Sequence, residues 1–154
     1  MLLKSDSPKE TLQIGKKLAE NLKKNDIICL FGEFGSGKTV LTQGIAMGLG
    51  IKRDLVVSPS FVIIRKYAGR QLSLNHFDLY RLQRTDDILT LGYEEYFYDE
   101  AVTVVEWAER MKGFLPKEYL KIEFFIMADR QRNLKVTAFG SRYRALLSRI
   151  HKSH

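Results

Sequence analysis

The sequence predicts an α/β fold in which a mixed, mostly parallel central sheet is flanked by helices. Short apolar runs of strand length alternate with segments of helical periodicity, which is typical of α/β sheets with parallel pairing. Some neighbouring runs are separated only by short turns, which favours hairpins and therefore a mixed sheet. The chain has 154 residues, the length of one ordinary domain, and no linker-like stretch divides it. We therefore expect a single compact domain over residues 1–154.

The first third of the chain predicts a helix, a buried strand and a second helix. Residues 7–10 (Ser-Pro-Lys-Glu) have the pattern of a capping box with proline at the first helical position, so a helix is expected to about residue 23. The apolar run 27–31 is bounded by turn residues and predicts a buried strand. A loop over 32–37 leads into a helix over 38–49, which Gly50 ends.

The rest of the chain predicts more short strands and three helical segments. The expected strands are 55–57, 61–67, 72–77, 101–105, 120–127 and 134–138. The expected helical segments are 85–91, 94–98 and a basic carboxyl-terminal helix over 141–151 that Ser141 caps. The strands 61–67 and 72–77, and the strands 120–127 and 134–138, are the two predicted hairpins.

Composition excludes several classes of protein. Cys29 is the single cysteine, so no intramolecular disulfide and no cysteine-cluster metal site can form. No apolar run approaches the roughly 20 residues of a membrane helix, and the first ten residues turn polar after three, unlike a signal peptide. We therefore expect a cytoplasmic protein with no membrane association.

Positive charge is concentrated near the carboxyl terminus. The formal net charge is +7, and residues 129–154 hold seven Lys and Arg against one acid. One interpretation is an ordinary solvated helix face. The other is a patch for a phosphate-bearing partner, such as a nucleic acid. Composition does not choose between them.

The strongest functional signal is the phosphate-binding loop (P-loop) pattern G-x-x-x-x-G-K-[ST], matched in full by residues 32–39 (GEFGSGKT). The pattern needs a strand before it and a helix after it, and both are predicted here. Glycines let backbone N–H groups curl around phosphate oxygens, and the helix directs its positive end at them. Lys38 is then expected to bridge the β- and γ-phosphates, and the Thr39 hydroxyl is expected to bind Mg²⁺.

Two carboxylates at predicted strand ends are candidates for the same site. Glu106 follows the apolar strand 101–105, where it could bind the metal directly, bind it through a water, or polarise the attacking water. Asp78 follows the strand 72–77 and could hold a metal-bound water or orient the nucleophile, or it could merely cap the following turn. His76 is expected to be a packed, hydrogen-bonded histidine rather than a catalyst.

Three other positions leave alternatives open. Ser60 lies in a Ser-Pro-Ser-Phe segment that could sense the γ-phosphate as a switch, or could be a plain turn. Trp107 could stack in the cleft or seal the core. Arg132 could reach the nucleotide or be a solvated turn residue.

Together these segments resemble a known family, the bacterial tRNA threonylcarbamoyladenosine biosynthesis ATPases called TsaE or YjeE. The match runs in order along nearly the whole chain. It comprises Glu10-Thr11-Leu12, the P-loop, Ser58-Pro59-Ser60-Phe61, residues 76–82 (HFDLYRL), residues 91–97 (LGYEEYF) and Val105-Glu106-Trp107. The P-loop is common to many NTPases, whereas the HFDLYRL block and the Glu-Trp pair are far more specific.

The resemblance implies a compact P-loop NTPase fold and Mg²⁺-dependent ATP hydrolysis that is weak in isolation. It implies work with the TsaB and TsaD proteins, and with tRNA through their complex, on the adenosine beside the anticodon. The nucleotide cycle would reset that complex rather than form the new bond. The family's magnesium positions match Thr39 and Glu106, and its essential carboxylate matches Asp78. The implied nucleotide-binding residues are Thr11, Gly35, Ser36, Gly37, Lys38, Thr39, Val40 and Arg132.

Two departures from the family pattern are visible, and neither removes an essential residue. The loop commonly reads GDLGAGKT, and the later motif has Thr where this chain has Ser60. Two other functions are kept as alternatives: a small-molecule or nucleoside kinase, and a non-enzymatic nucleotide- or RNA-binding module. No lid insertion typical of kinases is visible, and the intact Lys38-Thr39 pair with Glu106 argues against an idle site. Oligomeric state is left open.

Overall fold

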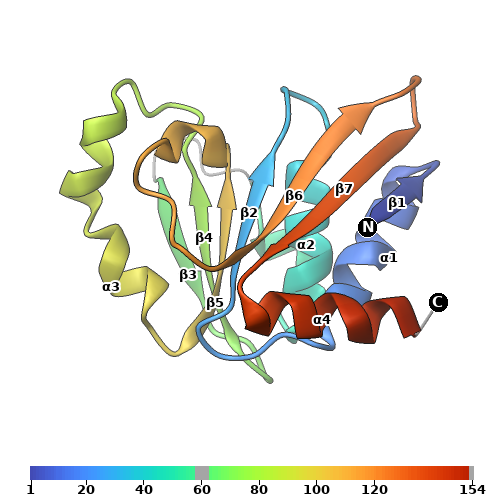
Figure 1. Ribbon diagram of the computed structural model, residues 1–154, viewed down its shortest axis with the longest axis horizontal. Coiled ribbons are helices and arrows are strands. Elements are labelled where there is room, and N and C mark those ends of the chain that lie inside the picture. The colour runs from blue at the N-terminus through green and yellow to red at the C-terminus, as the bar shows by residue number, and fades with distance from the viewer. Residues whose placement is uncertain (58–62, 153–154) are drawn as a thin grey trace.

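The computed structural model describes residues 1–57 and 63–152, and within them seven strands form one sheet (Figure 1). The strands are β1 (Leu2–Ser5), β2 (Ile27–Phe31), β3 (Ile64–Tyr67), β4 (Ser73–Asp78), β5 (Ala101–Glu106), β6 (Tyr119–Ile126) and β7 (Arg132–Phe139). Their order across the sheet is β1-β7-β6-β2-β5-β4-β3. The four central strands β6, β2, β5 and β4 are parallel, and the outer pairings are antiparallel. The predicted mixed sheet is confirmed.

Helices cover both faces of this sheet. The α-helices are α1 (Pro8–Ala19), α2 (Lys38–Gly48), α3 (Tyr93–Phe97) and α4 (Ser141–Lys152), and the 3₁₀ segments are η1 (Arg53–Leu55), η2 (Thr85–Leu91) and η3 (Ala108–Met111). Helices α1, α2 and α4 share one apolar core with the sheet, while η2, α3 and η3 build a second core on the other face. Figure 1 shows α1 and α2 on the side of the sheet opposite α3.

The register of the central strands places their functional ends together. Strand β5 lies between β2 and β4 and is parallel to both, with Asp78 of β4 paired to Glu106 of β5. Leu30, one residue before the end of β2, is also paired to Glu106. Because parallel strands end at the same edge of a sheet, the loop after β2 and both carboxylates meet there, as expected for a ligand site in an α/β sheet.

Helices α1 and α2 approach one another closely through glycine. A Cβ built on Gly44 would lie 2.2 Å from the Leu12 carbonyl oxygen, and one built on Gly15 would lie 2.5 Å from the Leu41 carbonyl oxygen. Backbone atoms cannot move aside for such a group, so both positions need glycine. This contact fixes α2, which follows the P-loop, against α1.

Helix α4 is fastened to the start of β2 by polar contacts. The Arg142 guanidinium donates to both carboxylate oxygens of Asp26, at 3.0 and 2.6 Å, and to the Asn21 carbonyl oxygen at 2.9 Å. The Ile27 N–H donates to the Tyr143 hydroxyl at 2.7 Å. Arg142, one of the basic carboxyl-terminal residues, therefore has a structural partner.

The amino-terminal region differs from prediction in two ways. Strand β1 was not expected, because its four residues carry no local pattern and are held by antiparallel pairing with β7, more than 100 residues away. Helix α1 begins as predicted, with Ser7 accepting from the Glu10 N–H, but ends at Ala19 rather than near Lys23. In a capping box the Glu10 carboxylate would also accept from the backbone N–H of Ser7. Here it accepts from the Asp6 N–H instead.

Two further predictions differ from the structure, and a third concerns residues that the structure does not describe. The strand expected over 55–57 is wrong: the segment forms 3₁₀ helix η1 and its end, with only Val56 buried and Leu55 and Val57 exposed. Ser141 begins α4 instead of capping it. The predicted switch segment with Ser60 lies outside the described residues. Among the helices of the described part of the chain, none is long and apolar enough to cross a membrane.

Candidate functional site

The P-loop joins β2 to α2 in the predicted strand–loop–helix arrangement. Gly35 has φ 75° and Gly37 has φ 107°, both in the left-handed region that favours glycine. Gly37 is also the N-cap of α2, and no side chain caps that end. The first N–H groups of α2 and the positive end of its dipole are therefore directed at the loop, which is the geometry of a phosphate site.

Lys38 is the first residue of α2, and its ammonium group turns back into the loop. It donates to the carbonyl oxygens of Gly32 and Glu33, at 2.5 and 2.9 Å, and to Ser36 Oγ at 3.3 Å. Burial lowers the pKa of Lys38, and the carboxylates of Glu109, Glu106, Asp78 and Glu33, in that order, act in the opposite direction. The amine is thus held by acceptors of the loop and by surrounding negative charge.

Glu106 is the centre of a buried polar cluster at the end of β5. Its Oε2 accepts from Thr39 Oγ1 at 3.3 Å and lies 3.0 Å from His76 Nε2, while its Oε1 accepts from Thr42 Oγ1 at 3.3 Å. Glu106 is 1% exposed and His76 is fully buried. A buried carboxylate needs such partners, so the cluster fixes the position of the Glu106 oxygens relative to the P-loop helix.

Asp78 lies beside Glu106 at the end of β4. Its Oδ1 accepts from the Tyr80 N–H at 3.1 Å, so the side chain also stabilises the turn after the strand, as the alternative interpretation proposed. The residue is buried, and its side chain lines the same cavity as Glu106. Both predicted roles therefore remain compatible with its position.

Trp107 lies at the edge of the same cavity. Its backbone has φ 58°, a left-handed conformation that costs a bulky residue on the order of 1–3 kcal/mol. The ring lies 4.1 Å from Lys38 Nζ, measured to the ring centroid, and 5.0 Å from the Tyr80 ring. Trp107 also packs partly against the second apolar core. It therefore both contacts the site and covers the core.

These residues surround one cavity of about 420 Å³. Its lining is made by Phe34, Gly35, Ser36, Gly37, Lys38, Thr39, Val40, Asp78, Tyr80, Glu106 and Trp107. The structure thus brings together the predicted phosphate-loop residues, both carboxylates and Trp107.

Thr11 and Arg132 lie on the other side of the P-loop, in an adjoining smaller hollow. Thr11 Oγ1 lies 2.8 Å from Ser5 Oγ, and the Arg132 guanidinium donates to the carbonyl oxygens of Ser36 and Gly35, at 3.2 and 3.3 Å. The hollow also contains Ser7, Pro8, Gly37, Val40, Asp129 and Arg130. Arg132 therefore links the β6–β7 hairpin to the P-loop by hydrogen bonds. It lines the same hollow as Thr11.

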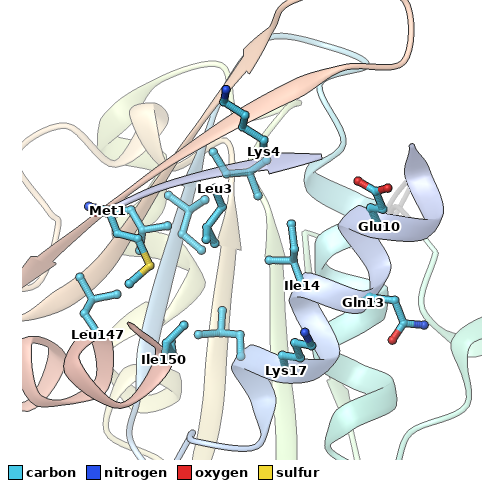
Figure 2. A pocket seen from close by; sticks show the side chains of 13 residues that line it. Met1, Leu3, Lys4, Glu10, Gln13, Ile14, Lys17, Leu147 and Ile150 are labelled. Carbon is cyan, nitrogen blue, oxygen red and sulfur yellow. The ribbon is translucent and has the colours of Figure 1, made fainter. Parts of the chain in front are cut away.

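A third hollow is apolar and shares no lining residue with the other two (Figure 2). It lies between β1, α1 and α4, with Leu3, Ile14, Leu147 and Ile150 among its walls and Lys4 and Lys17 beside it. It contains none of the residues predicted for chemistry. The candidate chemical site is therefore the charged cavity at the P-loop, which is the larger of the two.

The oxygen atoms at the P-loop suit a magnesium ion. Thr39 offers a hydroxyl and Glu106 a carboxylate, 3.3 Å apart and both at the cavity wall. Mg²⁺ prefers oxygen ligands and is usually held by one or two protein groups, with waters and substrate phosphates completing its coordination. These two residues fit that description.

Comparisons with known proteins identify the family of this chain. A family model described as "Threonylcarbamoyl adenosine biosynthesis protein TsaE" matches residues 5–134. The chain belongs to the TsaE family. Its relatives include the Bacillus subtilis tRNA threonylcarbamoyladenosine biosynthesis protein TsaE, which is 40% identical over 95% of this chain and 90% of that protein. The Treponema pallidum TsaE is 35% identical over 86% of this chain and 96% of that protein.

A solved structure shows the same fold. The crystal structure of Bacillus subtilis YdiB aligns with a TM-score of 0.85 and 35% sequence identity, over 99% of this chain and 95% of that one. The predicted family is therefore confirmed, and with it the assignment to a family of tRNA threonylcarbamoyladenosine biosynthesis.

Thr42 was not among the residues predicted for the site, and His76 was predicted only as a packed residue. Thr42 lies three residues after Thr39 on α2, and side chains at that spacing share a helix face. His76 lies two residues before Asp78 on β4, so both side chains point to the same face of the sheet. These two spacings are the signals that could have indicated the cluster around Glu106.

Proposed function

We propose that this protein is the Mg²⁺-dependent ATPase subunit of the machinery that makes tRNA N6-threonylcarbamoyladenosine, acting with TsaB and TsaD in the cytoplasm. One contact carries the chemical part of this proposal, the hydrogen bond from Thr39 Oγ1 to Glu106 Oε2 at 3.3 Å. It joins the P-loop helix to the end of β5 in the cavity that also holds Lys38. Family membership supports the tRNA-modification part.

The loop and Lys38 would bind the triphosphate. The N–H groups at the start of α2 are directed at the cavity, and each can donate to a phosphate oxygen. The Lys38 ammonium has three N–H donors, which it now gives to Gly32, Glu33 and Ser36. Transferring any of them to a phosphate exchanges a neutral acceptor for a charged one, which gives a stronger hydrogen bond.

Thr39 and Glu106 would hold the magnesium ion, which when bound neutralises charge on the phosphates. His76 and Thr42 keep the Glu106 carboxylate from rotating away, because they hydrogen-bond its two oxygens separately. Because the Glu106 carboxylate is already held in position, it does not have to reorganise during the reaction, which lowers the activation free energy.

The attacking water would be oriented by one of the two carboxylates in the cavity. Asp78 and Glu106 are paired across β4 and β5 and both line the cavity wall, so each can accept a hydrogen bond from a water facing the γ-phosphate. Hydrolysis would be slow in the isolated chain and faster with its partners. Its role would be to reset the modifying complex, with tRNA bound through that complex.

Two substitutions test the site assignment. Lys38→Ala removes the loop's cation and should abolish nucleotide binding or turnover. Glu106→Gln keeps the side chain's shape and should spare much of the binding while slowing hydrolysis by about 10²–10³-fold. Binding is measured with a fluorescent ATP analogue, and turnover as phosphate release with TsaB, TsaD and tRNA present.

Exposed residues of the same type provide matched controls. Lys52→Ala and Glu95→Gln remove the same charges from exposed positions outside the cavity and should behave like the wild type. If Lys38→Ala and Glu106→Gln also hydrolyse ATP normally with the partners, the assignment is wrong.

A further inference from the structure

The apolar hollow between β1, α1 and α4 has a volume of about 210 Å³ (Figure 2). Its floor is formed by buried aliphatic side chains of α1 and the sheet, which are Leu18, Ile122, Leu134 and Val136. Its walls are partly buried aliphatic side chains from three different elements, Leu3, Ile14, Leu147 and Ile150. Protein interiors contain few voids larger than a water molecule, so a hollow of this size beside the core is an unusual feature.

The hollow is held open from two sides. Helix α1 is fixed against α2 by the close backbone contacts at Gly15 and Gly44. Helix α4 is fixed at its first turn by the pair of Arg142 and Asp26, ahead of Leu147 in the wall. Because the two helices are anchored to different parts of the fold, neither can move freely to close the space between them. The hollow is therefore preformed, as small-molecule sites usually are.

The size of the hollow limits what it can hold. A dry apolar cavity of about 150 Å³ is enough for a benzene molecule, whereas drug-sized ligands occupy about 300–1,000 Å³. At roughly 30 Å³ for each water-sized group, a volume of about 210 Å³ holds a chain of about seven carbon-sized groups. The apolar part of a ligand is therefore short.

The charged residues around the hollow favour an anionic head group. Figure 2 shows Lys17 along the α1 edge and Lys4 extending from β1, and both side chains are exposed. In the described part of the chain, neither ammonium group has a hydrogen-bond or ion-pair partner, and a lysine's flexible four-carbon stem lets it turn toward a ligand. Among the described lining residues the one carboxylate is that of Glu10, which already accepts from the Asp6 N–H at 2.8 Å.

We propose that this hollow binds a small amphipathic anion, with a straight apolar tail of about seven carbons and one negatively charged head. The tail replaces water on the aliphatic walls, and each buried methylene raises the affinity about fourfold. The head lies at the opening, within reach of Lys4 and Lys17. Lysine acts as a point charge, so a carboxylate or a phosphate can fill this role. The hollow shares no lining residue with the two at the P-loop, so binding there is independent of the proposed ATPase function.

The test is a calorimetric titration with octanoate, with the bound position located by methyl NMR. We expect a dissociation constant below about 1 mM. The methyl signals of Ile14, Leu147 and Ile150 should shift, and that of Ile88, buried in the second core, should not. Butanoate lacks four of the methylenes and should bind about 100-fold more weakly. Octylammonium should bind more weakly than octanoate and octyl phosphate, whichever of these two anions is preferred.

The tail site is tested by filling the hollow. Ile14→Phe and Leu147→Phe place a ring in it from α1 and α4, and each should weaken the binding of octanoate and of neutral octanol by about 10-fold or more, because the ring displaces several methylenes of the tail. Leu89→Phe is the matched control at an exposed position of η2. It should bind both probes like the wild type.

The head site is tested by removing charge. Lys4→Gln combined with Lys17→Gln should weaken octanoate binding about 2- to 30-fold, the range for losing two exposed ion pairs, and should leave octanol binding unchanged. Lys9→Gln combined with Lys135→Gln removes the same charges from exposed positions that do not line the hollow and should have no effect. Nucleotide affinity, measured in parallel, should stay at the wild-type value in every variant, because none of the changed residues lines the P-loop cavity.

Several results would overturn this binding site. One is the absence of octanoate binding below about 1 mM; if the two filling variants then lose affinity for the TsaB–TsaD complex, the hollow is a contact for a partner protein instead. Another is octanoate binding that neither the filling variants nor the paired lysine variant changes, which indicates non-specific adsorption. A lack of stimulation of phosphate release by the partners would count against the proposed function alone.

Discussion

Removing the Arg142 guanidinium should cost this fold a large part of its stability. Arg142 makes two hydrogen bonds to the Asp26 carboxylate, whose side chain is 4% exposed. In Arg142→Met the aliphatic stem remains, and the buried Asp26 charge keeps only the Lys23 N–H at 2.7 Å. Breaking a buried ion pair costs about 3–5 kcal/mol. Because the Arg142 side chain is 25% exposed, we expect a loss of about 3 kcal/mol.

The assay is urea unfolding followed by the fluorescence of Trp107, the single tryptophan. A loss of about 3 kcal/mol lowers the urea midpoint by about 1–3 M for ordinary m-values. Arg144→Met, at an exposed position of α4, is the control and should stay within about 0.5 kcal/mol of the wild type.

A second substitution tests the cause. Adding Asp26→Asn to Arg142→Met removes the unpaired charge and should recover part of the loss, with a coupling of about 2 kcal/mol in a double-mutant cycle. The reasoning is refuted if Arg142→Met destabilises the protein no more than Arg144→Met, or if the double variant shows no recovery.

Three other features give further tests. Gly44→Ala should lower the free energy of unfolding by about 2–3 kcal/mol in urea, despite alanine's better helix propensity, because its Cβ would meet the Leu12 carbonyl oxygen at 2.2 Å; unchanged stability would contradict the close helix contact. Since burial lowers the pKa of Lys38, the ammonium group should lose its proton at a lower pH than an exposed lysine does. Nucleotide affinity, measured by calorimetry, should therefore fall before the pH reaches the range in which an exposed lysine titrates. An affinity that stays constant up to that range would contradict this prediction. Mg-ATP should change Trp107 emission saturably, because the ring contacts Lys38, and a titration that shows binding by calorimetry without any such change would remove Trp107 from the site.

The P-loop and its flanking elements could be predicted from sequence because their signal is local. A buried strand, a glycine-rich turn and a helix start lie within residues 27–49, and each has its own pattern. The two carboxylates could also be predicted, since Glu106 ends an apolar run, Asp78 follows a predicted strand, and the parallel register brings such strand ends together.

The parts that sequence analysis missed depend on contacts between distant segments. Strand β1 is held by its partner β7, and no local pattern marks it. His76 reaches Glu106 only because β4 and β5 are neighbours in the sheet, and Arg142 reaches Asp26 across 116 residues. The sequence therefore could not indicate which basic residues of the carboxyl-terminal stretch have structural partners and which face solvent.

The central claim is that this chain is a partner-dependent ATPase of tRNA modification. It is tested most directly by steady-state phosphate release from Mg-ATP, measured for the chain alone and with TsaB, TsaD and tRNA added. We predict slow turnover alone and strong stimulation by the partners, with both rates lowered about 10²–10³-fold by Glu106→Gln. Turnover that is the same with and without the partners, or that Glu106→Gln leaves at the wild-type rate, would contradict the account.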